Sequence, residues 1–201
     1  MVVTGIYYAM AFIAGGVIVG WLARPAWGAP MFLLAAFFLW FFRDPERTVP
    51  QGPHAVSPAD GRVTAVKPES GLTRVSIFLN PFDVHVNRTP VGGRILEAVY
   101  KPGEFLVASR EEASVRNEQN IVTVECDDGV RVVFKQIAGL VARRCVLNKT
   151  AGDIVQMGER IGLMQFSSRM DVLFGPEWRI LVREGQRVVA GETIIAQRNP
   201  S

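Results

Sequence analysis

The sequence predicts a mainly β domain preceded by a transmembrane helical hairpin, and two observations support this. From Ile6 to Phe42 the only charged residue is Arg24, whereas charged residues recur every few positions from Arg43 onward. Beyond that break, short runs rich in Val, Ile, Phe and Thr alternate with glycine and proline, which is the pattern of strands and turns. We therefore expect a membrane-anchoring hairpin over residues 1–44 and a β-rich domain over residues 45–201.

The hairpin is predicted from two apolar runs separated by Arg24 and Pro25. Ile6–Ala23 has about the length that a bilayer-spanning helix needs, and Ala26–Phe42 is slightly shorter. Pro25 cannot continue the first helix, so the short connection makes the two helices antiparallel. The length of the second run leaves a full crossing and a re-entrant or interfacial arrangement both open.

Charges at the ends of the hairpin predict its orientation. Arg43 and Arg47 follow the second run, against Arg24 alone in the connection. The positive-inside rule therefore places the β-rich domain in the cytoplasm, on the inner face of the cell membrane. A cleaved signal peptide fits less well, because the N-terminus has no positive region and a second apolar run follows at once.

Composition excludes several classes of partner. The formal net charge is only +3 and no Lys/Arg cluster stands out, so we expect no nucleic-acid partner. Two histidines and two cysteines without a CxxC motif predict no metal site. Cys126 and Cys145 are expected to be buried free thiols of a cytosolic domain, with a disulfide as the alternative. The sequence leaves the oligomeric state open, a homo-oligomer included.

The β-rich domain contains ten candidate strands and one segment, Glu104–Asn117, that is expected to be loosely helical or irregular. The candidate strands are Arg62–Val66, Thr73–Leu79, Gly93–Tyr100, Ile121–Cys126, Arg131–Ile137, Arg143–Leu147, Arg160–Phe166, Met170–Phe174, Arg179–Val182 and Thr193–Gln197. Such a strand-weighted domain is expected to close or stack its sheets so that the edges are covered.

An internal repeat refines the predicted fold. Gly152–Ile161 is echoed 33 residues later by Gly185–Ile194, each copy giving a turn, a short apolar step, a glycine turn and a strand. Paired units of this kind resemble the halves of lipoyl/biotinyl-like barrel-sandwich folds, which is the fold we expect. Carrier domains of that fold present a modified lysine in a tight turn, and no lysine lies near the corresponding turn here. The fold is therefore predicted without the carrier function.

Three polar segments are candidates for chemistry. His85 lies in the polar stretch Asn80–Pro90, where a catalytic and a structural histidine are both open interpretations. Asp60 precedes Gly61, and an Asp-Gly pair is by itself a common turn. Ser167 and Ser168 lie between two strand-like segments, as either an exposed polar loop or part of a Ser-His-Asp hydrolase, although no GxSxG motif is present.

Taken in order, these segments resemble a known family. The quoted motifs are FFRDPER (Phe41–Arg47), SPADGRV (Ser57–Val63), FDVHVNRTPVGGRI (Phe82–Ile95), RNEQN (Arg116–Asn120), QIAGLVARR (Gln136–Arg144), GERIGLMQFSSRMDV (Gly158–Val172) and GQRVVAGETIIA (Gly185–Ala196). The chain closely resembles the short, bacterial and archaeal type of phosphatidylserine decarboxylase proenzyme. The resemblance covers nearly the whole chain, with the motifs in the family's order.

The resemblance implies a self-processing lyase with a covalent pyruvoyl group made from Ser168. Cleavage between Ser167 and Ser168 would give a β chain ending at residue 167 and an α chain of residues 168–201, which stay together as partners. By resemblance, Asp60 is the base for processing and His85 the proton donor in turnover. The implied substrate is phosphatidylserine in the lipid bilayer, and the product is phosphatidylethanolamine.

Two positions depart from the family's pattern. Ser167 replaces the usual glycine before the scissile bond, although serine pairs are cleaved in another pyruvoyl family, the bacterial histidine decarboxylases. Arg88 stands where longer relatives carry a second histidine that assists cleavage, and His54 is a candidate for that help. An unprocessed phospholipid-binding relative and a Ser168-based lipid hydrolase are the competing hypotheses.

Overall fold

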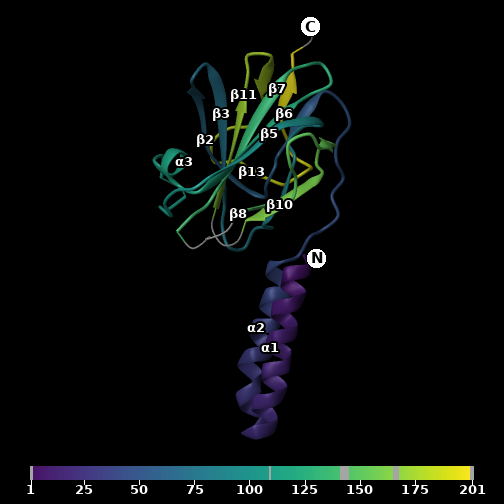
Figure 1. The fold of residues 1–201 in the computed structure, drawn as a ribbon, viewed down its shortest axis with the longest axis vertical. Helices are drawn as coiled ribbons and strands as arrows, with labels where there is room; N and C mark the ends of the chain where they lie inside the picture. The colour runs from purple at the N-terminus through teal and green to yellow at the C-terminus, as the bar shows by residue number, and fades with distance from the viewer. Residues whose placement is uncertain (1, 109, 141–144, 165–167, 200–201) are drawn as a thin grey trace. The chain divides into compact units, whose positions relative to one another are not determined.

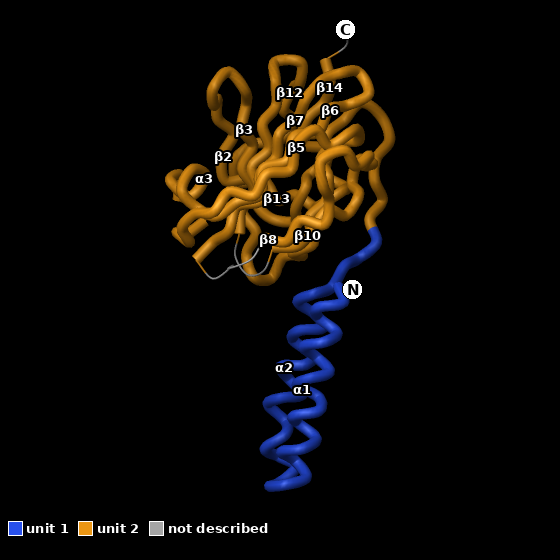
Figure 2. The backbone as a smooth tube through the Cα atoms, viewed as in Figure 1, with its two compact units in different colours: residues 1–46 blue, residues 47–201 orange. Residues whose placement is uncertain are grey.

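A computed structural model of the chain describes residues 2–108, 110–140, 145–164 and 168–199. The chain divides into two compact units, residues 1–46 and residues 47–201 (Figure 2).

The first unit consists of two apolar helices, α1 (Val3–Leu22) and α2 (Pro25–Phe41), which lie side by side in antiparallel directions (Figure 1). Small residues allow the two backbones to approach closely: a Cβ at Gly28 would collide with the carbonyl oxygen of Gly16. Further along the pair, the ring of Phe38 stacks against Phe12 at 5.3 Å between centroids. Most other side chains of the two helices are exposed, which is the reverse of a helix in a soluble core.

Only α1 has the length and composition of a bilayer-crossing helix among the described residues. It has 20 residues, and its most apolar window has a mean hydropathy of 1.7. The second helix has 17 residues, begins with Pro25 in its first turn and contains Pro30.

The second unit is mainly β, as the sequence predicts. Its described strands are β1 (His54–Val56), β2 (Gly61–Glu69), β3 (Leu72–Leu79), β4 (Val86–Arg88), β5 (Gly93–Lys101), β6 (Gln119–Glu125), β7 (Arg131–Ile137), β8 (Cys145–Leu147), β9 (Ile154–Val155), β10 (Arg160–Met164), β11 (Ser168–Phe174), β12 (Trp178–Ile180), β13 (Arg187–Val188) and β14 (Ile194–Arg198). The segment expected to be irregular contains one short helix, α3 (Ala113–Arg116).

Eight of the described strands form one curled antiparallel sheet in the order β13-β2-β3-β11-β7-β6-β5-β9 (Figure 1). Two three-stranded sheets, β1-β14-β12 and β4-β10-β8, complete the unit. Every residue of β11 is buried, so this central strand is covered on both faces. Its Met170 and Val172 pair with Ile77 and Val75 of β3 and belong to the apolar core, whereas Arg169 and Asp171 alternate onto the opposite face.

The repeat predicted from the sequence has the same local structure in both copies. Gly152 and Gly158 have φ values of 97° and 76°, and their counterparts Gly185 and Gly191 have 86° and 74°. These left-handed values favour glycine and place a turn at each of the four positions. The two-residue strands of the copies, β9 and β13, lie at the two edges of the eight-stranded sheet, so the repeat completes both edges.

Four strands, β1, β4, β9 and β13, were not among the candidate strands predicted from the sequence. Each has only two or three residues. Runs this short carry too few positions to show a period of two. Two expected strands extend beyond the described residues: β8 is described from Cys145 and β10 as far as Met164.

Candidate active site

Ser168 is the first residue of β11, and its side chain belongs to the interior face of the sheet. It pairs with Leu79 on β3 and lies on the same face as Met170, so its neighbours on this face are apolar. The residue is fully buried, and its Oγ has no hydrogen-bond partner among the described residues. A buried hydroxyl in that state is costly, and an unexplained one often marks a functional position. Ser167, the other half of the predicted cleavage site, lies outside the described residues.

His85 lies between β3 and β4 and is also buried. Its Nδ1 is 2.9 Å from the carbonyl oxygen of Asp83. Because a carbonyl only accepts hydrogen bonds, Nδ1 carries the proton in this contact and Nε2 is the ring atom left to exchange one. The backbone carbonyl of His85 accepts a hydrogen bond from the N–H of Met164, four residues before Ser168. The strand that leads toward Ser168 therefore runs past His85.

A chain of buried amides connects the strand after His85 to β7, which pairs with the strand of Ser168. Gln136 Nε2 donates to Asn87 Oδ1 at 2.9 Å, and Asn120 Nδ2 donates to Gln136 Oε1 at 2.9 Å. Gln136 on β7 pairs directly with Met170 on β11. The amide chain therefore ties β4, which begins immediately after His85, to the strand beside β11. His85 also follows Leu79, the β3 partner of Ser168, by only six residues, so His85 and Ser168 lie toward the same end of β3.

Asp60 comes immediately before β2, at the same end of the sheet. Its carboxylate accepts hydrogen bonds from Arg47 Nη2 at 2.9 and 3.1 Å and from the backbone N–H of Ala190 at 2.8 Å. Strands β2 and β11 flank β3, so two strand spacings, about 10 Å, separate their backbones. No hydrogen bond joins Asp60 to Ser168 within the described part of the chain. Asp60 therefore lies at about the level of Ser168 along the sheet, without a hydrogen bond to it.

The neighbours of Asp60 include two residues to which the sequence analysis gave different roles. Arg47 was used only as a positive charge that predicts the orientation of the hairpin in the membrane. In the structure its guanidinium forms a salt bridge to Asp60. Arg88 donates from Nη1 to the carbonyl of Gly158 at 3.0 Å, and its N–H donates to the carbonyl of Pro58, two residues before Asp60. The pattern that identified Asp60 contained no signal for Arg47, which is distant in sequence.

The opposite face of β11 carries a buried charge cluster beside Ser168. Arg169 binds the Asp171 carboxylate through Nε and Nη2 at 2.7 and 2.8 Å, and donates from Nη1 to the carbonyl of Arg110 at 3.1 Å. Ser114 Oγ donates to Asp171 at 2.7 Å. Burial alone raises the pKa of Asp171, but the hydrogen bonds and charge of Arg169 outweigh it, so the pKa lies below its ordinary value. These contacts hold the segment around α3 against β11.

Known proteins that are similar to this chain share one description. The family model described as phosphatidylserine decarboxylase matches residues 34–196. A phosphatidylserine decarboxylase proenzyme of Solibacter usitatus is 65% identical over 198 residues, which cover 98% of this chain and 97% of the relative. The chain belongs to the phosphatidylserine decarboxylase family.

More distant relatives bear the same name. The phosphatidylserine decarboxylase proenzyme of Erythrobacter litoralis is 43% identical over 210 residues, covering 94% of this chain and 84% of the relative. That of Rickettsia felis is 47% identical over 176 residues, covering 82% and 76%. The resemblance found in the motifs is therefore confirmed over nearly the full length of the chain.

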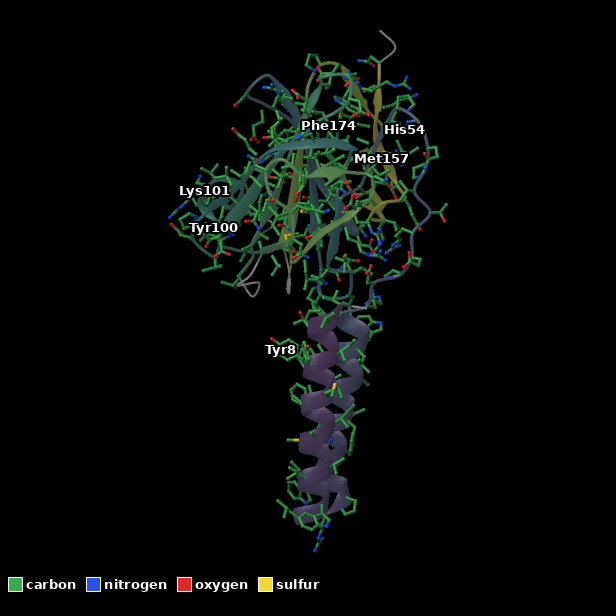
Figure 3. All side chains as sticks on the ribbon, turned by 45° about the vertical axis from the view of Figure 1, so that its right-hand side comes forward. Tyr8, His54, Tyr100, Lys101, Met157 and Phe174 are labelled. Atoms are coloured by element: carbon green, nitrogen blue, oxygen red, sulfur yellow. The ribbon has the colours of Figure 1, made fainter. Side chains whose placement is uncertain are left out.

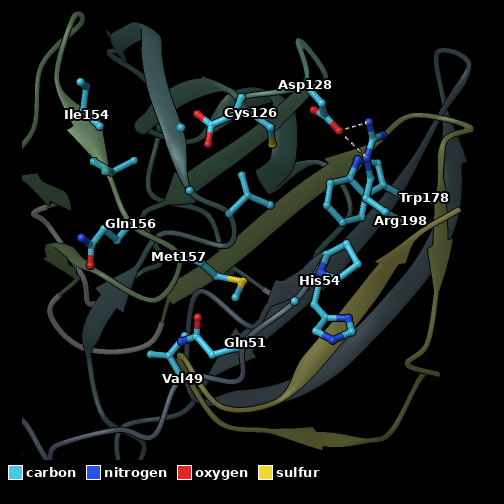
Figure 4. A pocket seen from close by; sticks show the side chains of 17 residues that line it. Val49, Gln51, His54, Cys126, Asp128, Ile154, Gln156, Met157, Trp178 and Arg198 are labelled. Atoms are coloured by element: carbon cyan, nitrogen blue, oxygen red, sulfur yellow. Dashed lines mark hydrogen bonds and ion pairs between the residues drawn. The ribbon is translucent and has the colours of Figure 1, made fainter. Parts of the chain in front are cut away.

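In this member of the phosphatidylserine decarboxylase family, His54 lies apart from Ser168. It lines a cavity of about 800 Å³ together with Met157, Trp178 and Arg198 (Figure 4). The ring of Trp178 contacts Phe174, which is at the other end of β11 from Ser168. Figure 3 labels His54, Met157 and Phe174 in the same part of the unit.

The cysteines of this family member are free thiols. Burial raises the pKa of Cys126 to about 11 and that of Cys145 to about 12, so both thiols stay protonated near neutral pH. Within the described ranges, no three His, Cys, Asp or Glu side chains come together as a metal would require.

Proposed function

We propose that the chain is a self-processing, pyruvoyl-dependent decarboxylase that converts phosphatidylserine to phosphatidylethanolamine and CO₂. Family membership supports the reaction, and the buried Ser168 hydroxyl at the start of β11 is the observation that carries the proposal for the site. Loss of CO₂ from the serine headgroup leaves an ethanolamine headgroup, so substrate and product differ by that one group.

The surroundings of Ser168 fit a pyruvoyl group. A serine hydroxyl there has no hydrogen-bond partner among the described residues, and its neighbours on the interior face, Leu79 and Met170, are apolar. A ketone with a methyl group is neutral and lacks a hydroxyl, so it suits this position better than serine does. When present, the group supplies a ketone that takes up the substrate amine and accepts the electron pair released as CO₂ leaves.

The chain's own backbone provides the group. We propose that Ser168 Oγ attacks the carbonyl carbon of residue 167, breaking the C–N bond and forming an ester while the nitrogen of residue 168 becomes an amine. A base then removes the α-proton of residue 168, and the carboxylate of residue 167 leaves. Water hydrolyses the resulting dehydroalanine to the ketone and ammonia. The products are a β chain ending at residue 167 and an α chain beginning at residue 168.

We assign the base to Asp60 and the proton donor to His85. Asp60 lies about two strand spacings from β11, which favours proton transfer through a bridging water or side chain over direct contact. Arg47 and the N–H of Ala190 orient the Asp60 carboxylate for this role. His85 is oriented by the carbonyl of Asp83 through Nδ1, so the ring, once protonated on both nitrogens, delivers the Nε2 proton to the former α-carbon of the substrate.

The apolar unit suits an enzyme that acts on a lipid. Removing roughly 30 methylenes of a diacyl lipid from the bilayer, at about 0.8 kcal/mol each, costs more than 20 kcal/mol, which exceeds ordinary binding free energies. We propose that residues 1–44 anchor the catalytic domain of residues 45–201 as a transmembrane helical hairpin on the cytoplasmic face of the inner membrane. The paired glycine repeat supports a barrel-sandwich fold for that domain.

Mass spectrometry of the purified protein tests the proposal. We expect two chains, the smaller covering residues 168–201 with a pyruvoyl-blocked N-terminus, and inactivation by borohydride in the presence of phosphatidylserine. A single intact chain of 22.2 kDa that binds phosphatidylserine without turnover would refute it in favour of a phospholipid-binding protein. Lipid hydrolysis that survives borohydride would instead indicate a serine hydrolase.

A further inference from the structure

Exposed apolar side chains gather at one end of the β unit. Tyr100, Val115 and Leu140 are 57%, 66% and 59% exposed, and Val107 is 39% exposed. We call these four residues the apolar rim. Large side chains with this exposure are normal when scattered singly, but a group around one site indicates an interaction surface.

Strand register places the rim at the end of the sheet that carries Ser168. One row of paired residues runs across four neighbouring strands, from Arg169 through Ile137 and Gln119 to Lys101. Ser168 precedes the first residue of this row, and Tyr100 precedes the last. Leu140 comes three residues after Ile137, the residue of this row that ends β7. The rim and the buried serine therefore share one end of the sheet.

Hydrogen bonds hold the other two rim residues to this row. Lys101 Nζ donates to the carbonyl of Val115 at 3.1 Å, which attaches α3 to the end of β5. Asn117 Nδ2 donates to the carbonyls of Leu106 and Ala138 at 2.8 and 2.7 Å, so Val107 lies close to the segment after β7. The rim is thus built on fixed backbone, and Figure 3 shows Tyr100 and Lys101 together at the margin of the unit.

The chemistry of the rim suits a bilayer surface. Tyrosine and lysine beside aliphatic side chains are the combination found where proteins meet lipid headgroups, because both carry an apolar body and a polar tip. Two of the four acidic residues between positions 104 and 118 form ion pairs, Glu104 with Arg116 and Glu111 with Arg74, and these pairs also neutralise the two arginines. Attraction to anionic lipid is therefore small, and burial of apolar side chains provides the contact.

We propose that the apolar rim is a second membrane-contact surface, which places the Ser168 end of the catalytic domain on the lipid from which the substrate comes. This inference rests on the proposed function, since a lipid-linked headgroup reaches a buried site only where that site approaches the bilayer. Its residues belong to the β unit, and the surface acts in addition to the apolar helices.

Lipid-depth quenching tests the contact without enzyme activity. Single cysteines replace Val115, Leu140 or, as the control, Ile154, which is 71% exposed and lines the cavity that also contains Trp178. The native cysteines react slowly at neutral pH, so a thiol-specific dye labels the new site selectively. The full chain is reconstituted in phosphatidylcholine vesicles whose acyl chains carry spin labels. We expect quenching at positions 115 and 140, little effect of salt, and none at 154. Equal quenching at all three positions, or at none, would overturn the proposal.

Kinetics provide the second readout. Val115→Ser with Leu140→Ser should raise the KM for phosphatidylserine in vesicles about tenfold, because buried methylenes are lost at the lipid surface. The double variant should match the parent in self-cleavage and in turnover of a monomeric short-chain phosphatidylserine. The control variant Ile154→Ser should match the parent in every assay. An unchanged vesicle KM would contradict the proposal. If no variant decarboxylates, the proposed function fails, while the quenching still decides the membrane contact.

Discussion

Replacement of Gln136 by leucine tests whether the buried amide chain positions the site. Gln136 is fully buried, and it accepts from Asn120 and donates to Asn87, each at 2.9 Å. Leucine has a similar size and removes both of these hydrogen bonds, together with the longer one that Gln136 Nε2 donates to the carbonyl of Val146 at 3.4 Å. Asn120 keeps the carbonyl of Cys145 as a partner at 3.1 Å, whereas Asn87 Oδ1 loses its hydrogen-bond donor among the described residues.

The expected loss of stability follows from these contacts. One lost hydrogen bond costs about 1 kcal/mol, and one buried acceptor left without a donor costs about 1–3 kcal/mol. The sum is about 3 kcal/mol, which for a chain of this size lowers the Tm by about 6–12 °C. Because β4 then loses its connection to β7, we also expect slower self-cleavage at Ser168.

Thermal unfolding of the detergent-solubilised full chain, followed by near-UV circular dichroism, measures the first effect, and gel electrophoresis of nascent protein measures the second. The matched control is Gln197→Leu, because this amide lies on β14 and its hydrogen bond with Arg179 is exposed. Its Tm should stay within about 2 °C of the parent. If Gln136→Leu behaves like this control in both assays, the reasoning about the amide chain is wrong.

Four further predictions concern the candidate site and the thiols. Ser168→Ala should remain a single chain without decarboxylase activity by mass spectrometry and CO₂ release, and normal activity would end the pyruvoyl proposal. Asp60→Asn should accumulate uncleaved chain on gels because the base for processing is lost; cleavage at the parental rate would remove that role. His85→Ala should cleave but release CO₂ at least about 100-fold more slowly, the usual contribution of a general acid; parental turnover would exclude His85 as the donor. Cys126 and Cys145 should resist iodoacetamide at pH 8 in the folded protein. Because their raised pKa values favour the protonated folded state, stability should be full below about pH 9 and fall as pH rises toward 11. Rapid alkylation at pH 8 without unfolding would contradict this.

The strand pattern was predictable where local sequence determines it. Arg131–Ile137 has the bounds expected from its alternation, and the four repeat glycines occupy the turns that their positions indicate. Short strands such as β4 exist only because a partner strand is present, since two or three residues cannot specify an extended conformation alone. His85 was identified as a candidate residue, whereas the strand that begins immediately after it was missed.

In the candidate site, too, residue identity could be predicted from local sequence, whereas contacts between distant residues could not. Ser168, His85 and Asp60 could be named from their motifs, because the resemblance carries residue identity along the chain. Arg47 and Gln136 could not be assigned contacts, since their partners Asp60 and Asn87 are 13 and 49 residues away. Pairing across such separations depends on which strands become neighbours.

The sequence by itself determined that an apolar segment precedes a strand-rich domain and that the domain carries the motifs of a decarboxylase proenzyme. Those properties depend on composition and on residue order, which are local. Only the tertiary structure decided that the Ser168 hydroxyl is buried on the inner face of the central strand, with a charge cluster on the other face. Burial depends on which strands cover β11, and that follows from packing the whole sheet rather than from any single segment.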